Sequence, residues 1–436
     1  MQHSAPARNW VGDNGKIIEP LFADYFLSLH PMRCFQGRLF TVDGMVEDEA
    51  PLKKEIYEQV RYYATTSVAR RIEHIVQAIK LACASEPPEI QTDRIHVRNG
   101  TYFVDGHFTP EKEYCMNRLP IAYVPEAPAP TRWLQFLNEL LYEEDIPALQ
   151  EYIYCLLPVT KAQKMLLMVG KGGEGKSRIG LILRELFGNS MYTGSLQKVE
   201  TNRFARADLE YKLLLVDDDM KTEALPQTNN IKTLVTLEDK IDIERKGQQS
   251  VQGTLYVRFA CFGNGSLHAL YDKSNGFYRR QLLLTTKEKP VGRVDDPFLI
   301  DKMRGEKEGI LLWALEGLHR LIRNNYQFTI SERTAANLKE AMEQGNNILG
   351  FLKSEGYFEI RQGAKCKSTD FYKVYERWCL DNLEKPLAAS TFIHHLKDNQ
   401  KSLGIVYDDK CIGTNRGFHN VDVDLFLPVD VPSPWD

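Results

Sequence analysis

A glycine-rich segment at residues 170–177 is the part of this sequence whose residue types and spacing most directly imply chemistry. It reads GKGGEGKS, which matches the pattern G-x-x-x-x-G-K-[ST] of phosphate-binding loops. Glycines let consecutive backbone N–H groups turn toward phosphate oxygens without a clash from Cβ atoms. Lys176 would place its ammonium group on the β- and γ-phosphates, and Ser177 would hold Mg²⁺ through its hydroxyl. We therefore expect ATP and Mg²⁺ as the ligands of this loop.

The same glycines also match a second pattern. Gly170, Gly172 and Gly175 satisfy G-x-G-x-x-G, a dinucleotide fingerprint that also requires an acid at the end of a second strand about 20 residues later. Here residues 189–196 are polar and poor in strand-forming residues, and Glu200 is the nearest acid. The Lys-Ser pair after the last glycine favours the phosphate loop. We expect the nucleotide to contact Gly170, Gly172, Gly173, Glu174, Gly175, Lys176, Ser177 and Arg178.

Three aspartates follow an apolar run and could supply the acids that ATP hydrolysis needs. Residues 213–216 read LLLV, and Asp217, Asp218 and Asp219 come directly after them. A buried strand would deliver these carboxylates at its carboxyl end, beside the phosphates. We expect Asp217 to hold the Mg²⁺ shell and Asp218 to polarise the attacking water. The alternative is an acidic turn after a strand, without a catalytic role.

Two later segments carry further polar groups next to apolar strands. Residues 256–262 read YVRFACF and are followed by Gly263 and Asn264, and an amide at this place could donate to a phosphate oxygen or to water. Arg279 and Arg280 precede the apolar run at 281–284, and a guanidinium group suits the stabilisation of a transferred phosphate. Taken singly, Asn264 is typical of a turn and the arginines of an exposed surface pair.

The strands and helices that the apolar runs predict must position these residues. Strands are predicted at 165–169, 212–216, 255–262 and 280–285, with a helix at 177–187, and this alternation predicts a parallel sheet covered by helices. A strongly periodic helix is predicted at 308–324. The fold class expected is α/β.

The flanking regions have different patterns. Before the centre we expect helical structure over 52–84, a hairpin within 94–110 that turns at Asn99-Gly100, and two helices within 131–157. Helices at 347–354, 368–381 and 389–398, followed by strands at 405–407 and 421–427, are typical of a winged helix. The predicted domains are residues 1–130, 131–160, 161–330 and 340–436.

Composition limits the class of protein. The 436 residues carry a net charge of −4, so any surface for nucleic acid must be local. The eight cysteines are scattered without a C-x-x-C pair, which indicates reduced thiols and a cytoplasmic protein. No run of 18 apolar residues is present, so we expect no membrane span.

The order and spacing of these motifs resemble those of the superfamily 3 helicases of the AAA+ class. They are most similar to the phage/plasmid and poxvirus-type primase-helicases, with residues 170–177 like motif A, 213–218 like motif B, 256–264 like motif C, and 277–280 like the arginine-finger segment. Residues 237–247 are similar to the additional B′ motif, whose hairpin carries basic residues into a ring pore. The resemblance makes Lys240, Arg245 and Lys246 candidates for DNA contact; the alternative is a solvated run of mixed charge.

The resemblance implies a fold and a mechanism. An AAA+ P-loop core would follow an N-terminal associated domain and a helical collar, and precede a winged helix that binds duplex DNA, such as an origin, or a protein. A homo-hexamer would hold each ATP between one subunit's loop and the neighbour's Arg279 or Arg280, and would pull single-stranded DNA through its pore. The activity implied is an ATP-dependent DNA helicase in the replication of a phage, plasmid or other mobile element.

Departures from the family pattern leave alternatives open. Glu174 stands where the family often has Asn or another small polar residue, and motif B has three aspartates where the family commonly has a glutamate. No two-carboxylate primase pattern precedes residue 130, so a separate primase or polymerase is the expected partner. The alternative functions are an AAA+ ATPase switch or defence module that binds DNA or protein without unwinding, and a small-molecule or nucleoside kinase.

Overall fold

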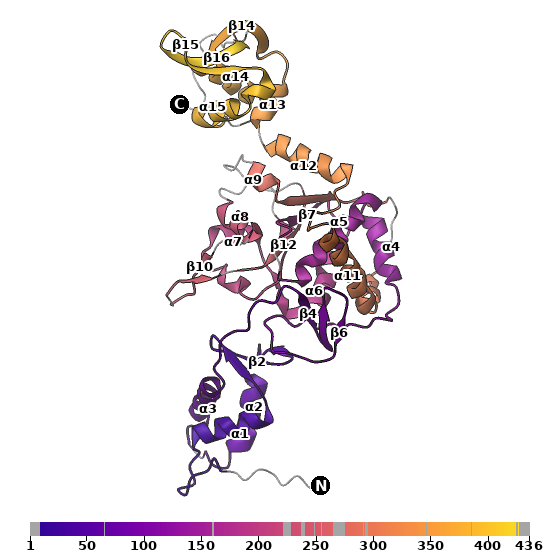
Figure 1. Ribbon diagram of the computed structural model, residues 1–436, viewed down its shortest axis with the longest axis vertical. Helices are drawn as coiled ribbons and strands as arrows, with labels where there is room; N and C mark the ends of the chain where they lie inside the picture. The colour runs from indigo at the N-terminus through magenta and orange to yellow at the C-terminus, as the bar shows by residue number, and fades with distance from the viewer. Residues whose placement is uncertain are drawn as a thin grey trace. The chain divides into compact units, whose positions relative to one another are not determined.

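The computed structural model divides the chain into two compact units (Figure 1). Unit 1 comprises residues 1–222, 228–266 and 279–334, and unit 2 comprises residues 223–227, 267–278 and 335–436. The residues that the structure describes are 9–64, 66–158, 161–220, 228–236, 240–247, 249–253, 255–264, 275–290, 292, 295–345, 347–384, 386–423 and 426. None of the described helices is both long and apolar enough to cross a membrane.

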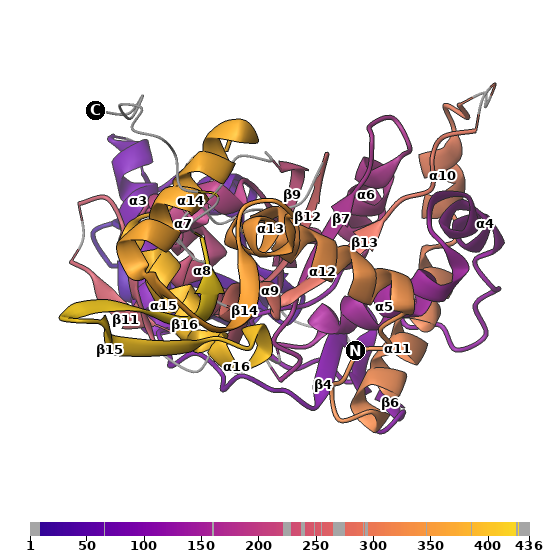
Figure 2. The same cartoon turned by 90° about the horizontal axis from the view of Figure 1, so that it is seen from above.

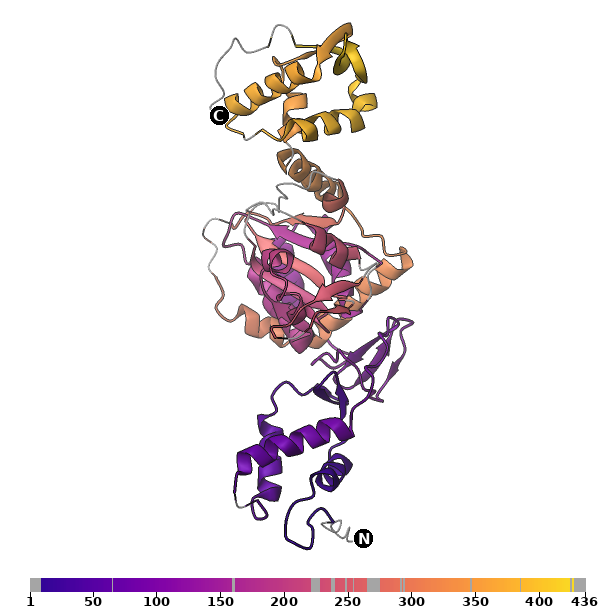
Figure 3. The same ribbon diagram turned by 90° about the vertical axis from the view of Figure 1, so that its left-hand side faces the viewer.

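The first part of unit 1 has its own small core (Figures 1 and 3). It consists of the helices α1 (Glu19–Leu29), α2 (Ala50–Val60) and α3 (Val68–Ala82) and an antiparallel sheet of β1 (Arg33–Phe35), β2 (Arg38–Thr41) and β3 (Gly44–Met45). The region predicted to be helical, 52–84, forms two helices, because α2 ends at Val60 and α3 begins at Val68. Tyr62, Tyr63 and Thr66, which lie between the two helices, are weak helix formers.

A second antiparallel sheet packs against the centre of unit 1. Its strands are β4 (Arg94–Val97), β5 (Gly100–Phe103) and β6 (Phe108–Thr109). The pairing of Val97 with Gly100 confirms the predicted hairpin turn at Asn99-Gly100. Ile95, Val97 and Tyr102 are buried in the core of the central sheet and not in that of α1–α3.

The centre of unit 1 is a mixed α/β fold around a five-stranded parallel sheet flanked by helices. The strand order is β13 (Gln281–Thr285), β7 (Met165–Val169), β12 (Arg258–Gly263), β9 (Leu214–Met220) and β8 (Met191–Thr193). Four of these strands confirm the predicted apolar runs. The fifth, β8, lies where residues 189–196 were judged poor in strand formers; it is a three-residue edge strand that pairs with β9.

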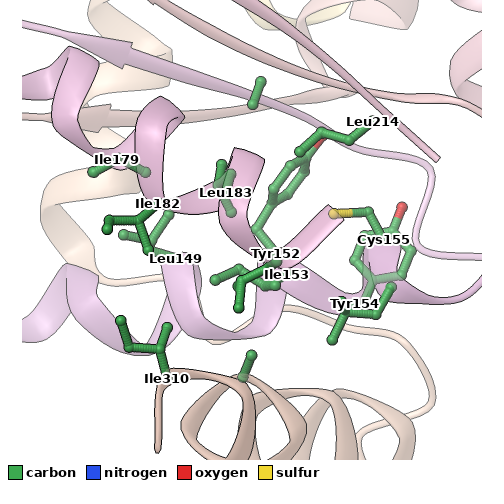
Figure 4. Packing of buried hydrophobic residues seen from close by; sticks show 14 of the residues in the cluster. Leu149, Tyr152, Ile153, Tyr154, Cys155, Ile179, Ile182, Leu183, Leu214 and Ile310 are labelled. Carbon is green, nitrogen blue, oxygen red and sulfur yellow. The ribbon is translucent and has the colours of Figure 1, made fainter. Parts of the chain in front are cut away.

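Helices cover this sheet and define its core. They are α4 (Thr131–Leu140), α5 (Ile146–Tyr152), α6 (Lys176–Phe187), α7 (Leu196–Thr201), α8 (Asn229–Thr236), α10 (Leu299–Arg304) and α11 (Lys307–Arg323), with 3₁₀ turns at η1 (Glu143–Asp145), η2 (Ile153–Leu156), η3 (Gly188–Ser190) and η4 (Ala207–Leu209). Figure 4 shows Ile179 and Ile182 of α6 in one apolar cluster with Leu149 of α5 and Ile310 of α11. The helix that starts at the glycine-rich loop is therefore fixed by its own apolar face.

Three elements lie outside these layers. An antiparallel hairpin of β10 (Ile241–Ile243) and β11 (Val251–Gly253) follows α8 in the sequence. The short helix α9 (Asn275–Tyr278) precedes β13, and α12 (Glu332–Gly345) precedes the helices of unit 2.

Unit 2 contains a small α+β domain with its own aromatic core. The helices α13 (Asn347–Lys353), α14 (Ser368–Asp381), α15 (Ala389–Asp398) and α16 (Gln400–Leu403) accompany an antiparallel sheet ordered β14 (Glu359–Lys367), β16 (Asn415–Asp422), β15 (Val406–Ile412). Three helices match the sequence-based expectation, whereas β14 was missed. The last strand was predicted at 421–427 but spans residues 415–422; Val423 and Phe426 are not in a strand, and residues 424, 425 and 427 lie outside the described residues.

Candidate nucleotide site

The glycine-rich loop connects β7 to α6 at the carboxyl end of the central sheet. Gly172, Gly173 and Gly175 adopt φ angles of +109°, +80° and +116°, which other residues rarely accept. The loop is tied to the neighbouring strand β12 because the backbone N–H of Gly170 donates to the carbonyl of Gly263 at 3.2 Å. Lys176 is the first residue of α6, so the loop meets the positive end of a helix dipole.

A carboxylate of the loop itself lies among its donors. Glu174 accepts a hydrogen bond from the backbone N–H of Gly172 at 2.7 Å through Oε1, and from Lys176 Nζ at 2.8 Å through Oε2. Both charged side chains are buried, Glu174 at 3% and Lys176 at 8% exposure. Burial alone would raise the pKa of Glu174, but these hydrogen bonds outweigh it and hold the pKa below its usual value. The Glu174 carboxylate is therefore paired with Lys176, the group expected to bind phosphate.

Side chains from the next two strand ends lie beside the loop. A Cβ built on Gly172 would lie 3.7 Å from Nδ2 of Asn264, the residue that follows β12. A Cβ on Gly170 would lie 2.2 Å from Oγ1 of Thr286, so a larger residue here would have to displace the Thr286 side chain. Asn264 was expected here. Thr286 was not, because it lies one residue beyond the predicted strand and no motif marks it.

The aspartates of β9 point to opposite faces of the sheet. Val216 and Asp218 face α6, since a Cβ built on Gly180 would lie 3.4 Å from Val216 Cγ1 and 3.9 Å from Asp218 Oδ1. Asp217 alternates to the other face, where its Oδ2 accepts the backbone N–H of Leu196 at the start of α7, at 2.8 Å. Burial raises the pKa of Asp217, whereas Asp218 is exposed.

These positions decide which of the two aspartates could hold a metal ion. Ser177 is exposed in the first turn of α6, and Gly180, which Asp218 faces, lies one turn further along the same helix. The Asp217 carboxylate already accepts a hydrogen bond from the backbone N–H at the start of α7. Among the described residues, no cluster of three His, Cys, Asp or Glu side chains is arranged to hold a metal ion. A serine hydroxyl and one carboxylate, completed by phosphate and water oxygens, is a donor set that suits Mg²⁺.

A pocket of about 360 Å³ lies beside the loop. Arg178 of α6 lines it together with Arg132, Phe136 and Glu139 of α4, and with Pro290, Asp295, Asp296 and Leu299. Phe136 reaches the loop itself, since a Cβ on Gly175 would lie 3.4 Å from its ring. Helix α4 is held in place by Glu306, whose carboxylate accepts the backbone N–H groups of Arg132 and Trp133 at 3.0 Å.

Arg279 and Arg280 lie at the opposite end of the sheet from the loop. They precede β13, which runs parallel to β7 with Gln281 paired to Met165 and Thr285 paired to Val169. The five residues of β13 span roughly 16 Å at about 3.3 Å per residue, more than the length of an arginine side chain. Lys164 holds this end by donating to the carbonyl of Arg279 at 2.5 Å. The arginines therefore do not join the loop of the same chain.

The basic residues of the B′-like segment surround the β10–β11 hairpin. Lys240 is exposed immediately before β10, and Lys246 is exposed beyond it. Arg245 is half-buried and forms an ion pair with Glu210, and Glu244 pairs with Arg203. Residues 237–239 of this segment lie outside the described residues. Of the three DNA-contact candidates, the two lysines are thus exposed and the arginine is held by an acid.

Two protein families and several solved structures resemble different parts of the chain. Residues 168–280 match a family of unknown function, DUF5906, and residues 29–141 match the family described as D5 N terminal like. An apo structure of the NrS-1 C-terminal region has a TM-score of 0.51 and 12% identity, covering 92% of this chain and 99% of that chain. The A-form apo structure of the same region has a TM-score of 0.50 and 11% identity, covering 92% and 100%. No curated protein sequence matches. The likeness to the NrS-1 C-terminal region extends over most of the fold described above.

Proposed function

We propose that this protein is an ATP-dependent DNA helicase of the AAA+ class that acts in the replication of a phage, plasmid or other mobile element. The observation that carries the proposal is the meeting of three groups at one end of the sheet. The loop at 170–177 follows β7 and Asn264 follows β12, and Asp218 lies in the last part of the adjacent strand β9. The D5-like match over residues 29–141 and the NrS-1-like fold support a replication role.

The proposed site binds ATP mainly through its triphosphate. The loop N–H groups and Lys176 bind the β- and γ-phosphates, and Arg178 with Phe136 borders the pocket that would take the base and ribose. Ser177 and Asp218 would hold Mg²⁺, which neutralises charge on the phosphates. Asn264 orients a phosphate oxygen or the attacking water. Asp217 lies on the other face of the sheet and would act indirectly, through its hydrogen bond to the start of α7.

DNA would be bound by the hairpin and by unit 2. Lys240 and Lys246 are the exposed charges that would contact a single strand in the pore of a homo-hexamer. The helices and three-stranded sheet of unit 2 have the composition of a winged helix, for which duplex DNA or a replication protein is the proposed partner. We also propose that the protein works with a separate primase or polymerase, and that it acts in the cytoplasm.

Hydrolysis of ATP with and without single-stranded DNA tests the proposal most directly. We expect DNA to stimulate hydrolysis, and the assembly to have six times the mass of one chain by native mass spectrometry. The variant Lys176→Ala is the control and should be inactive in both conditions, because it lacks the phosphate-binding ammonium. Hydrolysis that no DNA alters would contradict the helicase assignment and revive a kinase-type function.

The variant Glu174→Gln is expected to bind ATP more tightly than the wild type. ATP must displace the Glu174 carboxylate from Gly172 and Lys176, and the neutral amide competes less with phosphate for a cation. We expect Kd for ATP to fall about tenfold, the equivalent of ~1.4 kcal/mol. Isothermal titration calorimetry measures it.

Glu288→Gln is the matched control for this substitution. It removes an exposed carboxylate that pairs with Lys171 of the same loop at 2.5 Å but lies outside the phosphate donors. Its Kd for ATP should stay within twofold of the wild type. Weaker binding by Glu174→Gln would mean that the carboxylate organises the loop for ATP instead of competing with it.

The alternative function is an ATPase switch that binds DNA or protein without unwinding. The ion pair between Arg245 and Glu210 favours it, because it removes one positive charge from the proposed DNA-contact surface. Strand displacement on forked DNA separates the two functions. A helicase releases the displaced strand in an ATP-dependent manner, and a switch does not.

A further inference from the structure

Two short helices pack beside the sheet, and buried charged side chains attach them at its nucleotide end and at its opposite end. The α7–α8 unit is defined here as α7 (Leu196–Thr201) and α8 (Asn229–Thr236). The two helices pack against each other (Figure 2), and α8 also packs on β12. The first attachment is Asp217, whose carboxylate binds the backbone N–H of Leu196. Asp217 directly precedes Asp218, the residue of the proposed site that faces α6.

The second attachment joins α7 to α8. Glu200 is 5% exposed, and its two carboxylate oxygens accept the backbone N–H groups of Asn230 at 3.2 Å and Ile231 at 2.9 Å. The Asn230 side chain returns a hydrogen bond to the carbonyl of Glu200 at 3.2 Å. A carboxylate at a helix N-terminus satisfies free N–H groups and is favoured by the helix dipole.

The third attachment is at the other end of α8. Arg258, the first residue of β12, is 1% exposed, and its guanidinium group donates to the carbonyls of Leu234 at 3.2 Å and Val235 at 2.9 Å. A cation at a helix C-terminus is again the sign that the dipole favours. Truncating either buried charge would leave buried backbone groups without these bonds. Helix α8 is therefore held at both ends by charges that come from other elements.

The α7–α8 unit connects the two regions that the proposed mechanism must couple. Its start is bound to the acidic end of β9, and its end at Thr236 precedes Lys240 and the β10–β11 hairpin by only a few residues in the sequence. Neither Glu200 nor Arg258 reaches the nucleotide loop. A displacement of β9 when nucleotide binds or leaves would move α7 through Asp217, and would move α8 with it through Glu200.

Building on the proposed function, we propose that Glu200 and Arg258 are positioning residues that make the α7–α8 unit a rigid link, through which the nucleotide state controls the basic hairpin. The link works in both directions, because a coupling free energy between two sites is reciprocal. DNA bound at the hairpin then stimulates hydrolysis, and ATP bound at the loop changes the affinity for DNA.

The test compares basal and DNA-stimulated hydrolysis in full-length Glu200→Gln, Arg258→Met and the conservative Arg258→Lys. For Glu200→Gln and Arg258→Met we expect basal hydrolysis within twofold of the wild type and at least a fivefold loss of stimulation by single-stranded DNA. The effect of ATP on Kd for a fluorescent oligonucleotide should also fall at least fivefold. Arg258→Lys keeps one cation at the carbonyls and should restore part of the stimulation.

Thr201→Ala, an exposed position next to Glu200, is the matched control and should behave as the wild type. Unchanged stimulation in Glu200→Gln and Arg258→Met would overturn the link while leaving the proposed function intact. A parallel fall of basal and stimulated activity, with a lower melting temperature, would also overturn it, since both residues would then be only structural. Wild-type protein without any DNA stimulation would overturn the proposed function, and the link with it.

Discussion

Asp218→Ala is expected to abolish ATP hydrolysis without lowering stability, and Asp217→Ala is expected to lower stability. Asp218 is exposed and faces α6 beside Gly180, one turn from Ser177. Loss of a group that orients metal or water typically costs about 10²–10⁴-fold in rate. Asp217 is buried and binds the N–H of Leu196, so its removal leaves a buried donor unsatisfied and costs about 1–3 kcal/mol.

Three measurements separate the roles of these neighbouring carboxylates. Hydrolysis rates and thermal unfolding are recorded for both variants, and Mg²⁺-dependent ATP binding gives a readout that does not need turnover. We expect Asp218→Ala to keep the wild-type melting temperature and to lose the dependence of ATP affinity on Mg²⁺. If Asp217→Ala lost hydrolysis at unchanged stability while Asp218→Ala stayed active, the sequence-based assignment of Asp217 to the metal would stand.

The aspartates illustrate what the sequence could and could not reveal about the site. An apolar run of four residues predicted β9 and placed acids at its end, because burial on both faces requires such a run. Alternation along a strand also predicts that Asp217 and Asp218 face opposite ways. Which of them faces α6 depends on how that helix packs on the sheet, and a motif read along the chain carries no information on it.

Other features depended on contacts between distant segments. Arg258 is conspicuous in the sequence as a charge within an apolar strand, yet its acceptors are carbonyls of α8 from a different part of the chain. Glu174 departs from the family pattern, but only the folded loop reveals that its carboxylate pairs with Lys176. Both missed strands are edge strands of their sheets; β8 has only three residues, and β14 has few apolar residues.

The second large effect is expected at the arginines before β13. Arg279→Ala should reduce ATP hydrolysis about 10³–10⁵-fold while ATP binding persists, as for arginines that a neighbouring subunit supplies. A role within the same subunit does not fit, because β13 separates these residues from the loop by roughly 16 Å at about 3.3 Å per residue. Arg279 is exposed and Arg280 is partly buried, so we expect the larger loss at Arg279.

Mixing two inactive variants tests whether the arginine acts on a neighbour. Subunits with Lys176→Ala keep their arginines, and subunits with Arg279→Ala keep their loops. In a mixed ring, a loop from the second can face an arginine from the first, so part of the activity should return on mixing. Because each variant alone supplies only one half of the site, recovered hydrolysis has no source other than a shared interface. Activity that stays absent at every mixing ratio, although native mass spectrometry detects mixed assemblies, would rule out an arginine supplied from the neighbouring subunit.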